Sequence, residues 1–243
     1  MLGVSALLFA GGTEPSPEVT RPPPAEQFSV IPLRVHVLSA ADPAIDCKLS
    51  DEDVRRVIGK VNAVWRPAGV YFGLESIRRE AAANPDRFTR VREQLGAAPL
   101  ALFPGLIPEP SRQFRGLHVY YVHKMPVNGV YMGKDFLFVQ ETAALREVEG
   151  GIDEPVPRVT SHELGHALGL PHRQDRTNLM ASGTTGTLLN AAEVATAREG
   201  AGKIDGAITL AKCREAATAS NGSAAARQQR EWVADVEAGV PKG

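Results

Sequence analysis

The chain has 243 residues, enough for one domain of ordinary size with short appendages. With 43% hydrophobic and 23% charged residues, its composition is that of a globular protein and excludes a wholly disordered, collagen-like or coiled-coil chain. Lys and Arg (27) nearly balance Asp and Glu (28), so the net charge of -1 excludes a basic footprint for nucleic acid or an anionic membrane surface. No apolar run approaches the roughly 18 residues that a membrane span needs.

The two ends of the chain differ in composition from its middle. Residues 1–12 form a short apolar segment that ends in small residues and resembles the core of a signal peptide, although no Lys or Arg precedes it. We therefore expect a secreted protein, periplasmic or extracellular. Residues 13–27 are rich in proline and predict a linker. The folded domain is expected over residues 28–220, followed by a C-terminal tail, 221–243, with helical potential.

The first half of the predicted domain has α/β character. Residues 28–38 are β-branched and alternate in polarity, which indicates a strand, and residues 70–77 indicate a second one. Between them, Ser50 is a good N-cap for a helix over residues 51–66 with apolar side chains at helical spacing. This order implies a crossover between parallel strands. Residues 78–110 read as an insertion that contains a helix near 86–95.

The second half adds strands and then helices. Residues 117–122 indicate a buried strand, and residues 129–140 two short strands joined around Gly133 and Lys134. A helix is predicted over 159–168. Further helical segments are expected C-terminally, at 191–199, 207–218 and 224–237. The fold class is therefore α+β, with a mostly β sheet and a helix behind it.

The most informative stretch is HELGHALGLPH at residues 162–172, which holds three of the six histidines. His162 and His166 are four residues apart, so on a helix both imidazoles can reach one metal ion. Glu163 projects about 100° away, which suits a general base that holds the attacking water. Gly169 can take the left-handed conformation that ends the helix and returns His172 as a third ligand. Three imidazoles and one open position predict a single catalytic Zn²⁺.

This stretch resembles the signature of the metzincin zinc peptidases, HExxHxxGxxH, at every defined position. The resemblance implies a methionine turn that forms an apolar floor beneath the metal. Met180, eight residues after His172, takes that place with a spacing similar to matrixin-like members. It also implies a zincin fold: a twisted mixed sheet with a backing helix and an active-site helix, then a small C-terminal helical subdomain.

The same resemblance implies that an extended substrate pairs with the edge strand of the sheet, for which residues 129–132 and 136–139 are the two candidates. Two departures leave the subfamily open. Arg173, directly after the third histidine, fits none of the common subfamily choices, and Ser182 stands where astacin-like members have a tyrosine ligand.

The remaining histidines and cysteines have less specific interpretations. His118 and His123 flank a strand, where packing or surface roles compete with a second metal site that no clustered carboxylate completes. Cys47 and Cys213 are the only cysteines, and in an exported protein they could form a disulfide or stay free.

The predicted function is a zinc-dependent endopeptidase that hydrolyses peptide bonds through a metal-activated water with Glu163 as general base. Its partner is a peptide or protein substrate. Two alternatives remain open: a catalytically silent zinc-containing scaffold that binds peptides, and a zinc hydrolase that acts on another bond. Retention of Glu163 disfavours the scaffold, because binding alone does not need that carboxylate.

Overall fold

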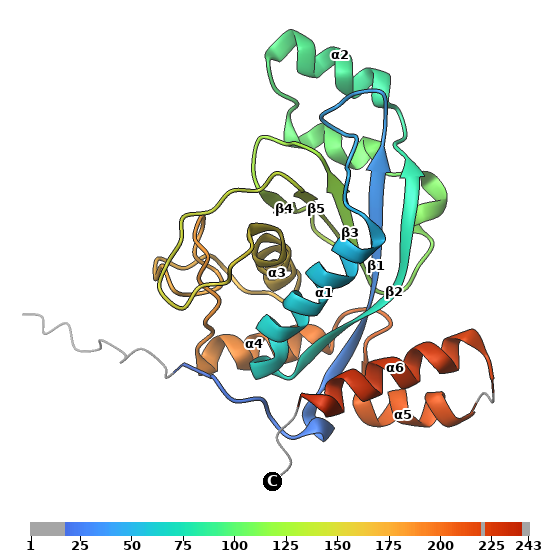
Figure 1. Cartoon of the computed structure of the whole chain (residues 1–243), viewed down its shortest axis with the longest axis vertical. Helices are drawn as coiled ribbons and strands as arrows, with labels where there is room; N and C mark the ends of the chain where they lie inside the picture. The colour runs from blue at the N-terminus through green and yellow to red at the C-terminus, as the bar shows by residue number, and fades with distance from the viewer. Residues whose placement is uncertain (1–17, 220–221, 240–243) are drawn as a thin grey trace, which may run out of the picture.

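The computed structural model describes residues 18–219 and 222–239. The signal-like segment, residues 1–12, lies outside the described residues. The described chain forms one twisted mixed sheet with helices on both faces and at one end (Figure 1). This confirms the predicted α+β class. The strands are β1 (Ser29–Ser39), β2 (Val70–Ala81), β3 (Leu117–Val122), β4 (Gly129–Tyr131), β5 (Phe136–Gln140) and β6 (Ile208–Thr209). The α-helices are α1 (Asp51–Trp65), α2 (Pro85–Leu95), α3 (Pro155–Ala167), α4 (Ala191–Ala201), α5 (Leu210–Ala219) and α6 (Ala224–Ala238).

The main sheet has the strand order β2-β1-β3-β5-β4. Strands β2, β1, β3 and β5 are parallel, as the predicted crossover requires, whereas β4 is antiparallel to β5. The short β6 pairs with the start of β1 in the antiparallel sense. Of the two candidates for the edge strand, β4 therefore lies at the edge and β5 inside the sheet.

Helix α1 begins at the predicted cap and packs on the sheet through its apolar stripe. Ser50 and Asp53 form a reciprocal capping box, which satisfies two backbone N–H groups at the helix start. Trp65 is fully buried at its end. Asn62, also buried, exchanges two hydrogen bonds of 2.8 and 3.0 Å with the backbone of Phe72 on β2. These contacts fix the helix against the sheet edge opposite β4.

Helix α3 lies beside α1 on the same face of the sheet (Figure 1). It starts at Pro155, four residues before the predicted start at 159. Pro155 and Pro157 are accommodated in the first turn, because the backbone N–H groups there have no intrahelical partner to lose. The sheet is thus covered on this face by two helices, α1 and α3, as the resemblance noted in the sequence implies.

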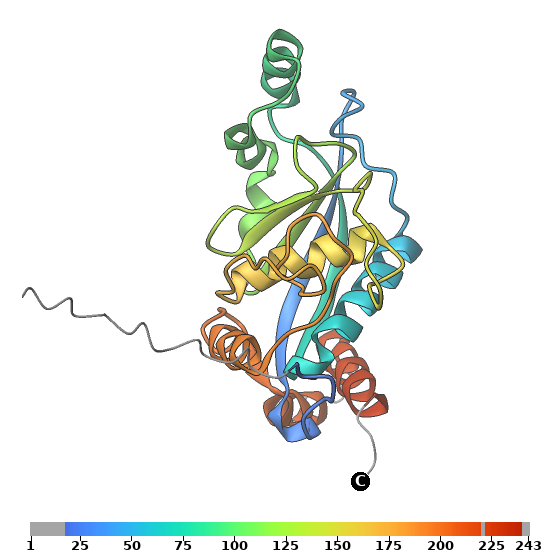
Figure 2. The same ribbon diagram turned by 90° about the vertical axis from the view of Figure 1, so that its left-hand side faces the viewer.

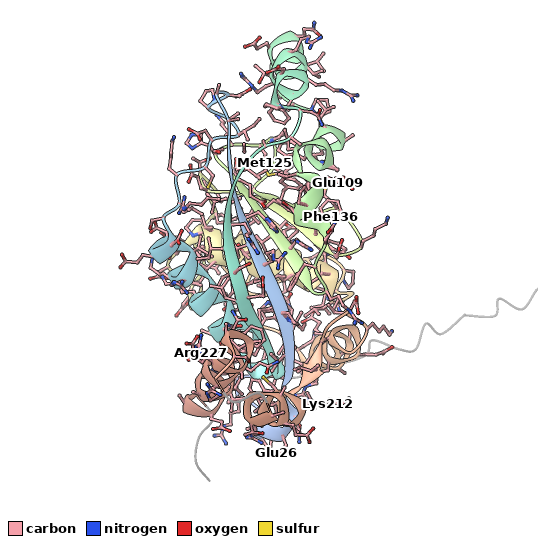
Figure 3. All side chains as sticks on the ribbon, turned by 90° about the vertical axis from the view of Figure 1, so that its right-hand side faces the viewer. Glu26, Glu109, Met125, Phe136, Lys212 and Arg227 are labelled. Atoms are coloured by element: carbon pink, nitrogen blue, oxygen red, sulfur yellow. The ribbon has the colours of Figure 1, made fainter. Side chains whose placement is uncertain are left out.

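The insertion, residues 78–110, contains the predicted helix, now α2, and the 3-10 helix η3 (Leu100–Leu106). A second 3-10 helix, η4 (Glu109–Arg112), begins at its end. The apolar side chains of the insertion cover the second face of the sheet, where Phe103 packs edge-on against Phe138 of β5. Figure 2 shows this insertion on the side of the sheet away from α3. Figure 3 looks onto that second face, with Met125 and Phe136 in its upper half.

The C-terminal helices form a layer at the other end of the sheet (Figure 3, around Lys212 and Arg227). Helices α5 and α6 pack on each other, and Trp232 of α6 is buried against Gly73 of β2, where an added Cβ would lie 2.6 Å from the indole ring. The tail predicted to have helical potential is therefore helical over α6 and contributes to a core cluster.

Part of the proline-rich segment runs along the domain. The backbone N–H of Val19 donates to Leu189 at 2.8 Å, and Glu18 forms an isolated bridge with Asn190. Residues 25–27 form a single 3-10 turn, η1 (Ala25–Gln27). Proline fixes the backbone angle and lowers the conformational entropy lost on ordering, so such a segment can lie on a surface without forming regular structure.

The two cysteines are buried and free, so the disulfide considered from the sequence is not present. Cys47 lies in the main core cluster and donates to Glu141 at 3.3 Å, whereas Cys213 lies in the separate cluster between α5 and α6. Among the described residues, no helix is long and apolar enough to cross a membrane.

Candidate functional site

The three predicted ligands meet where α3 ends. His162 and His166 lie one turn apart on α3, and Gly169 ends the helix with a φ of 90°. The N–H of Gly169 donates to His166 at 3.0 Å and that of Leu170 to Gly165 at 2.9 Å, the paired bonds of a Schellman motif. This turn reverses the chain and brings His172 back towards the helix.

The ring nitrogens of the three histidines converge on one point. Nε2 of His172 lies 3.2 Å from Nε2 of His162 and 3.1 Å from that of His166. On the far side of the two α3 rings, Nδ1 of His162 donates to the carbonyl of Leu179, and Nδ1 of His166 to that of Leu170, both at 2.8 Å. A carbonyl can only accept, so each Nδ1 carries the proton and each Nε2 keeps a lone pair.

Lone pairs that face each other repel, and a cation among them removes the conflict. Tetrahedral Zn²⁺ with Zn–N bonds of about 2.0–2.1 Å separates its nitrogen ligands by roughly 3.3 Å, close to the separations observed. Burial lowers the pKa of His162 to about 3 and also lowers that of His166, which keeps both rings in the neutral form that binds metal. The donor set and its tautomers therefore fit one zinc ion.

Glu163 lies beside this cluster and is held by the edge strand. Its Oε2 accepts a 2.8 Å hydrogen bond from the backbone N–H of Tyr131 on β4. Gly129, two residues earlier, leaves room for it, since an added Cβ there would lie 2.9 Å from Cγ of Glu163. Burial raises the pKa of Glu163 to about 7, against the opposing effects of the Tyr131 bond and of Arg158. The carboxyl group is thus positioned and can exchange a proton near neutral pH.

Met180 packs against α3 at Gly165, next to His166 in the sequence. It is fully buried, and its Sδ lies 2.6 Å from the position that a Cβ on Gly165 would take. Its backbone N–H donates to Oδ1 of Asn178 at 2.7 Å, and its carbonyl accepts from the backbone N–H of Arg173 at 2.9 Å. Only glycine at position 165 permits this close approach.

Arg173 does not match the residue of any common subfamily in the sequence. In the structure it links the turn that carries His172 to α4. Its Nε donates to Oε1 of Glu193 at 2.7 Å, while Oε2 of the same carboxylate accepts from Nδ2 of Asn178 at 2.8 Å. Glu193 is only 1% exposed. Sequence reasoning missed Glu193, although Asn190 and Glu193 have the spacing of a capping box, which the structure contains.

Arg158 is a second residue that sequence reasoning missed. It lies one turn before His162 on α3, is 2% exposed, and donates to the backbone carbonyls of Gly186, Asn178 and Ala181 at 3.0, 3.3 and 2.6 Å. Together with His162, Glu163 and His172 it lines a cavity of about 260 Å³. No pattern in the sequence marks this position, because its partners are carbonyls contributed by residues 178–186.

Comparison with known proteins gives fold-level similarities only. No family model matches the chain, and no curated protein matches it. Similar solved structures include archaemetzincin from Methanopyrus kandleri (15% identity, 72% of this chain and 88% of that chain, TM-score 0.39). Metalloproteinase-II from Bacteroides fragilis (12%, 76% and 57%, TM-score 0.42) and a zinc-dependent peptidase from Methanocorpusculum labreanum (13%, 70% and 99%, TM-score 0.32) are also similar. Similarities at this level do not decide the activity, which has to be inferred from the site itself.

Proposed function

We propose that this chain is a zinc-dependent endopeptidase of metzincin type. The observation that carries the proposal is the convergence of three Nε2 atoms, with the Nδ1 protons of His162 and His166 directed away to carbonyls, next to a buried and separately anchored carboxyl group. A purely structural zinc site has no need of that carboxyl group, and it is usually closed by a fourth protein ligand. In the described chain, the cluster of potential ligands has three members.

Each residue of the site has a separate role in the proposed hydrolysis. His162, His166 and His172 hold the ion, which when bound lowers the pKa of water and polarises a carbonyl oxygen. Glu163 accepts the proton of the attacking water and passes it to the leaving amine. Met180, in the place of the methionine turn, packs against α3 at Gly165 and so fixes the helix against the ligand loop.

The substrate is proposed to lie along β4. This strand forms one edge of the described sheet, and its inner side already bonds β5. An extended peptide on the outer side of Gly129–Tyr131 would pass beside Glu163, because the backbone N–H of Tyr131 on that side donates to the carboxylate. A peptide bond held in this way would be placed between the general base and the histidine cluster.

The test is cleavage of an unstructured protein by the full chain and by a Glu163→Gln variant. Gln keeps the shape of the side chain and removes the base, so turnover should fall by about 10³-fold or more while bound zinc is unchanged. A chelator should abolish wild-type cleavage and added zinc restore it. If the variant cuts as fast as the wild type, Glu163 is not the base.

The same experiment separates the alternatives. A protein that binds one zinc per chain and binds peptides without cutting them would be a scaffold. A protein that hydrolyses ester or sugar-amide substrates and no peptide would be a zinc hydrolase of another class. Export to the periplasm or the exterior is proposed on residues 1–12 alone, and N-terminal sequencing of the protein recovered from culture medium or periplasm tests it.

A further inference from the structure

Arg158 is a buried cation whose charge interacts with Glu163 but which has no carboxylate within ion-pair distance among the described residues. Its described contacts are with carbonyl oxygens and with His162, and no carboxylate in residues 18–219 and 222–239 forms an ion pair with it. Burial lowers its pKa to about 10, so the guanidinium still carries its charge at neutral pH. A buried charge is costly unless it is paired, and carbonyl dipoles compensate it only in part.

One edge of this guanidinium has no acceptor to which it can donate. Nε and Nη2 donate to the three carbonyls, whereas Nη1 lies 3.1 Å from Nδ1 of His162. That Nδ1 carries a proton when His162 binds metal through Nε2, since it donates to Leu179. Arginine can only donate hydrogen bonds. In the metal-binding tautomer of His162, the protonated Nδ1 therefore cannot accept from the N–H groups of Nη1.

The cavity beside the histidines gives a ligand access to this residue. Arg158, Val159, His162 and Glu163 all line it, which places Arg158 one helical turn away from the ligand pair along α3. Its other walls include the apolar Leu145 and the polar Ser182. About 260 Å³ accommodates one side chain of moderate size, with aliphatic walls for its stem and a cation for its end.

We propose that this cavity is a carboxylate-binding subsite, so that the enzyme selects peptides with Glu or Asp next to the scissile bond, or with a free C-terminal carboxylate there. This rests on the proposed peptidase function. The incoming carboxylate accepts from Nη1 of Arg158 and forms with it the close ion pair that Glu163 does not form. Arg158 is a specificity-determining residue in this account, in addition to bracing the loop of residues 178–186.

Binding to the zinc-loaded Glu163→Gln protein tests the subsite without turnover. Two peptides that differ only in Glu against Gln beside the expected scissile bond, both with amidated C-termini, should differ in affinity by about 10- to 100-fold in favour of Glu. A third peptide, without acidic side chains and with a free C-terminus, asks whether a terminal carboxylate is the preferred source. Equal affinities for all three, or no binding of either carboxylate-bearing peptide, would overturn the proposal.

Variants at position 158 assign the effect to this residue. Arg158→Met should reduce the preference to about 3-fold or less, and Arg158→Lys should retain part of it. Arg146→Met removes a nearby exposed arginine and should leave the preference unchanged; loss of preference in this control would overturn the assignment to Arg158. If Arg158→Met does not fold, the Glu/Gln pair together with Arg158→Lys and Arg146→Met still decides.

Cleavage of the same peptides by the wild type separates this proposal from the proposed function. If the wild type cuts the Gln and Glu peptides equally well, the peptidase function stands and the subsite fails. If the Glu peptide binds tightly to Glu163→Gln but the wild type cuts neither, the subsite stands and the peptidase function fails.

Discussion

Histidines gather on both faces of the sheet: His162, His166 and His172 on the α3 side, and His36 and His118 on the opposite face. The two groups differ in which of their ring nitrogens have hydrogen-bond partners within the protein. On the α3 side, His162 and His166 donate from Nδ1 to backbone carbonyls, which leaves Nε2 lone pairs directed at each other. On the opposite face, Nε2 of His36 bonds Nδ1 of His118 at 3.0 Å, and Nδ1 of His36 bonds Glu80 at 2.8 Å.

This difference shows what distinguishes a ligand histidine from a structural one. In the His36–His118 pair, one ring donates to the other, Ser111 of η4 donates to the same Glu80, and Tyr120 stacks on His36 with ring centroids 4.2 Å apart. Three of the four ring nitrogens of the pair are therefore hydrogen-bonded within the protein, and the two rings bond each other; only Nε2 of His118 has no hydrogen-bond partner, with Oδ2 of Asp135 3.9 Å away. In the α3 cluster, by contrast, Nδ1 of His162 and His166 is hydrogen-bonded to the backbone, whereas the Nε2 atoms remain available to bind a cation.

The largest expected effect comes from exchanging one histidine in each cluster. His166→Ala removes a ligand, so zinc affinity should fall by about 10²-fold or more and cleavage should be lost with it. His118→Gln, the matched control on the other face, should bind one zinc per chain like the wild type. Metal content after dialysis against a weak chelator measures both, and zinc loss in the control would show that the second cluster also binds metal.

The next effect concerns the carboxyl group beside the ligands. A Cβ at Gly129 would lie 2.6 Å from Cγ1 of Val159 and 2.9 Å from Cγ of Glu163, so Gly129→Ala should displace the base. Displacements of about 1 Å cost up to 10²-fold in rate, and we expect a 10- to 100-fold fall in kcat with zinc content unchanged. Gly59→Ala on α1, where a Cβ meets nothing within 4 Å, is the control. Unchanged kcat in Gly129→Ala would contradict the placement of Glu163.

The smallest effect is on stability and belongs to the structural cluster. Burial lowers the pKa of His36 to about 4, although Glu80 opposes this, while His118 and Arg34 add to the lowering. The unfolded chain, with a pKa near 6.5, then binds the proton more tightly than the folded one. Stability contributed by neutral His36 is complete above pH 6.5 and is lost as the pH falls towards 4, by on the order of 3 kcal/mol.

Denaturant unfolding of the wild type and of His36→Gln at pH 7 and pH 4.5 measures this contribution. The variant has no titrating ring at position 36, so its free energy of unfolding should fall less between the two pH values than that of the wild type. The same fall in both proteins would assign the acid sensitivity to other groups.

Local patterns predicted those parts of the fold that depend on neighbours in the sequence. The capping residue and apolar stripe of α1, the ligand spacing on α3 and the turn at Gly169 are all set within about ten residues. Strand β4 is the edge strand because β5, and not β4, pairs with β3. The alternation of polar and apolar residues does not predict which strands pair.

The residues that the sequence did not reveal act through distant partners. Arg158 bonds carbonyls 20 to 28 positions away, and Glu193 joins Arg173 and Asn178 from another helix. The covering of the second face by residues 78–110 depends on where β2 and β3 place the ends of that segment. Such contacts form only when the folded topology brings distant segments together, so local sequence patterns do not predict them.

The most direct test is the anomalous zinc signal in crystals of the full chain grown with one equivalent of zinc. The account predicts a single peak about 2.1 Å from Nε2 of His162, His166 and His172, with no peak at His36 or His118. A peak at the second cluster, or no peak among the three Nε2 atoms, would contradict it.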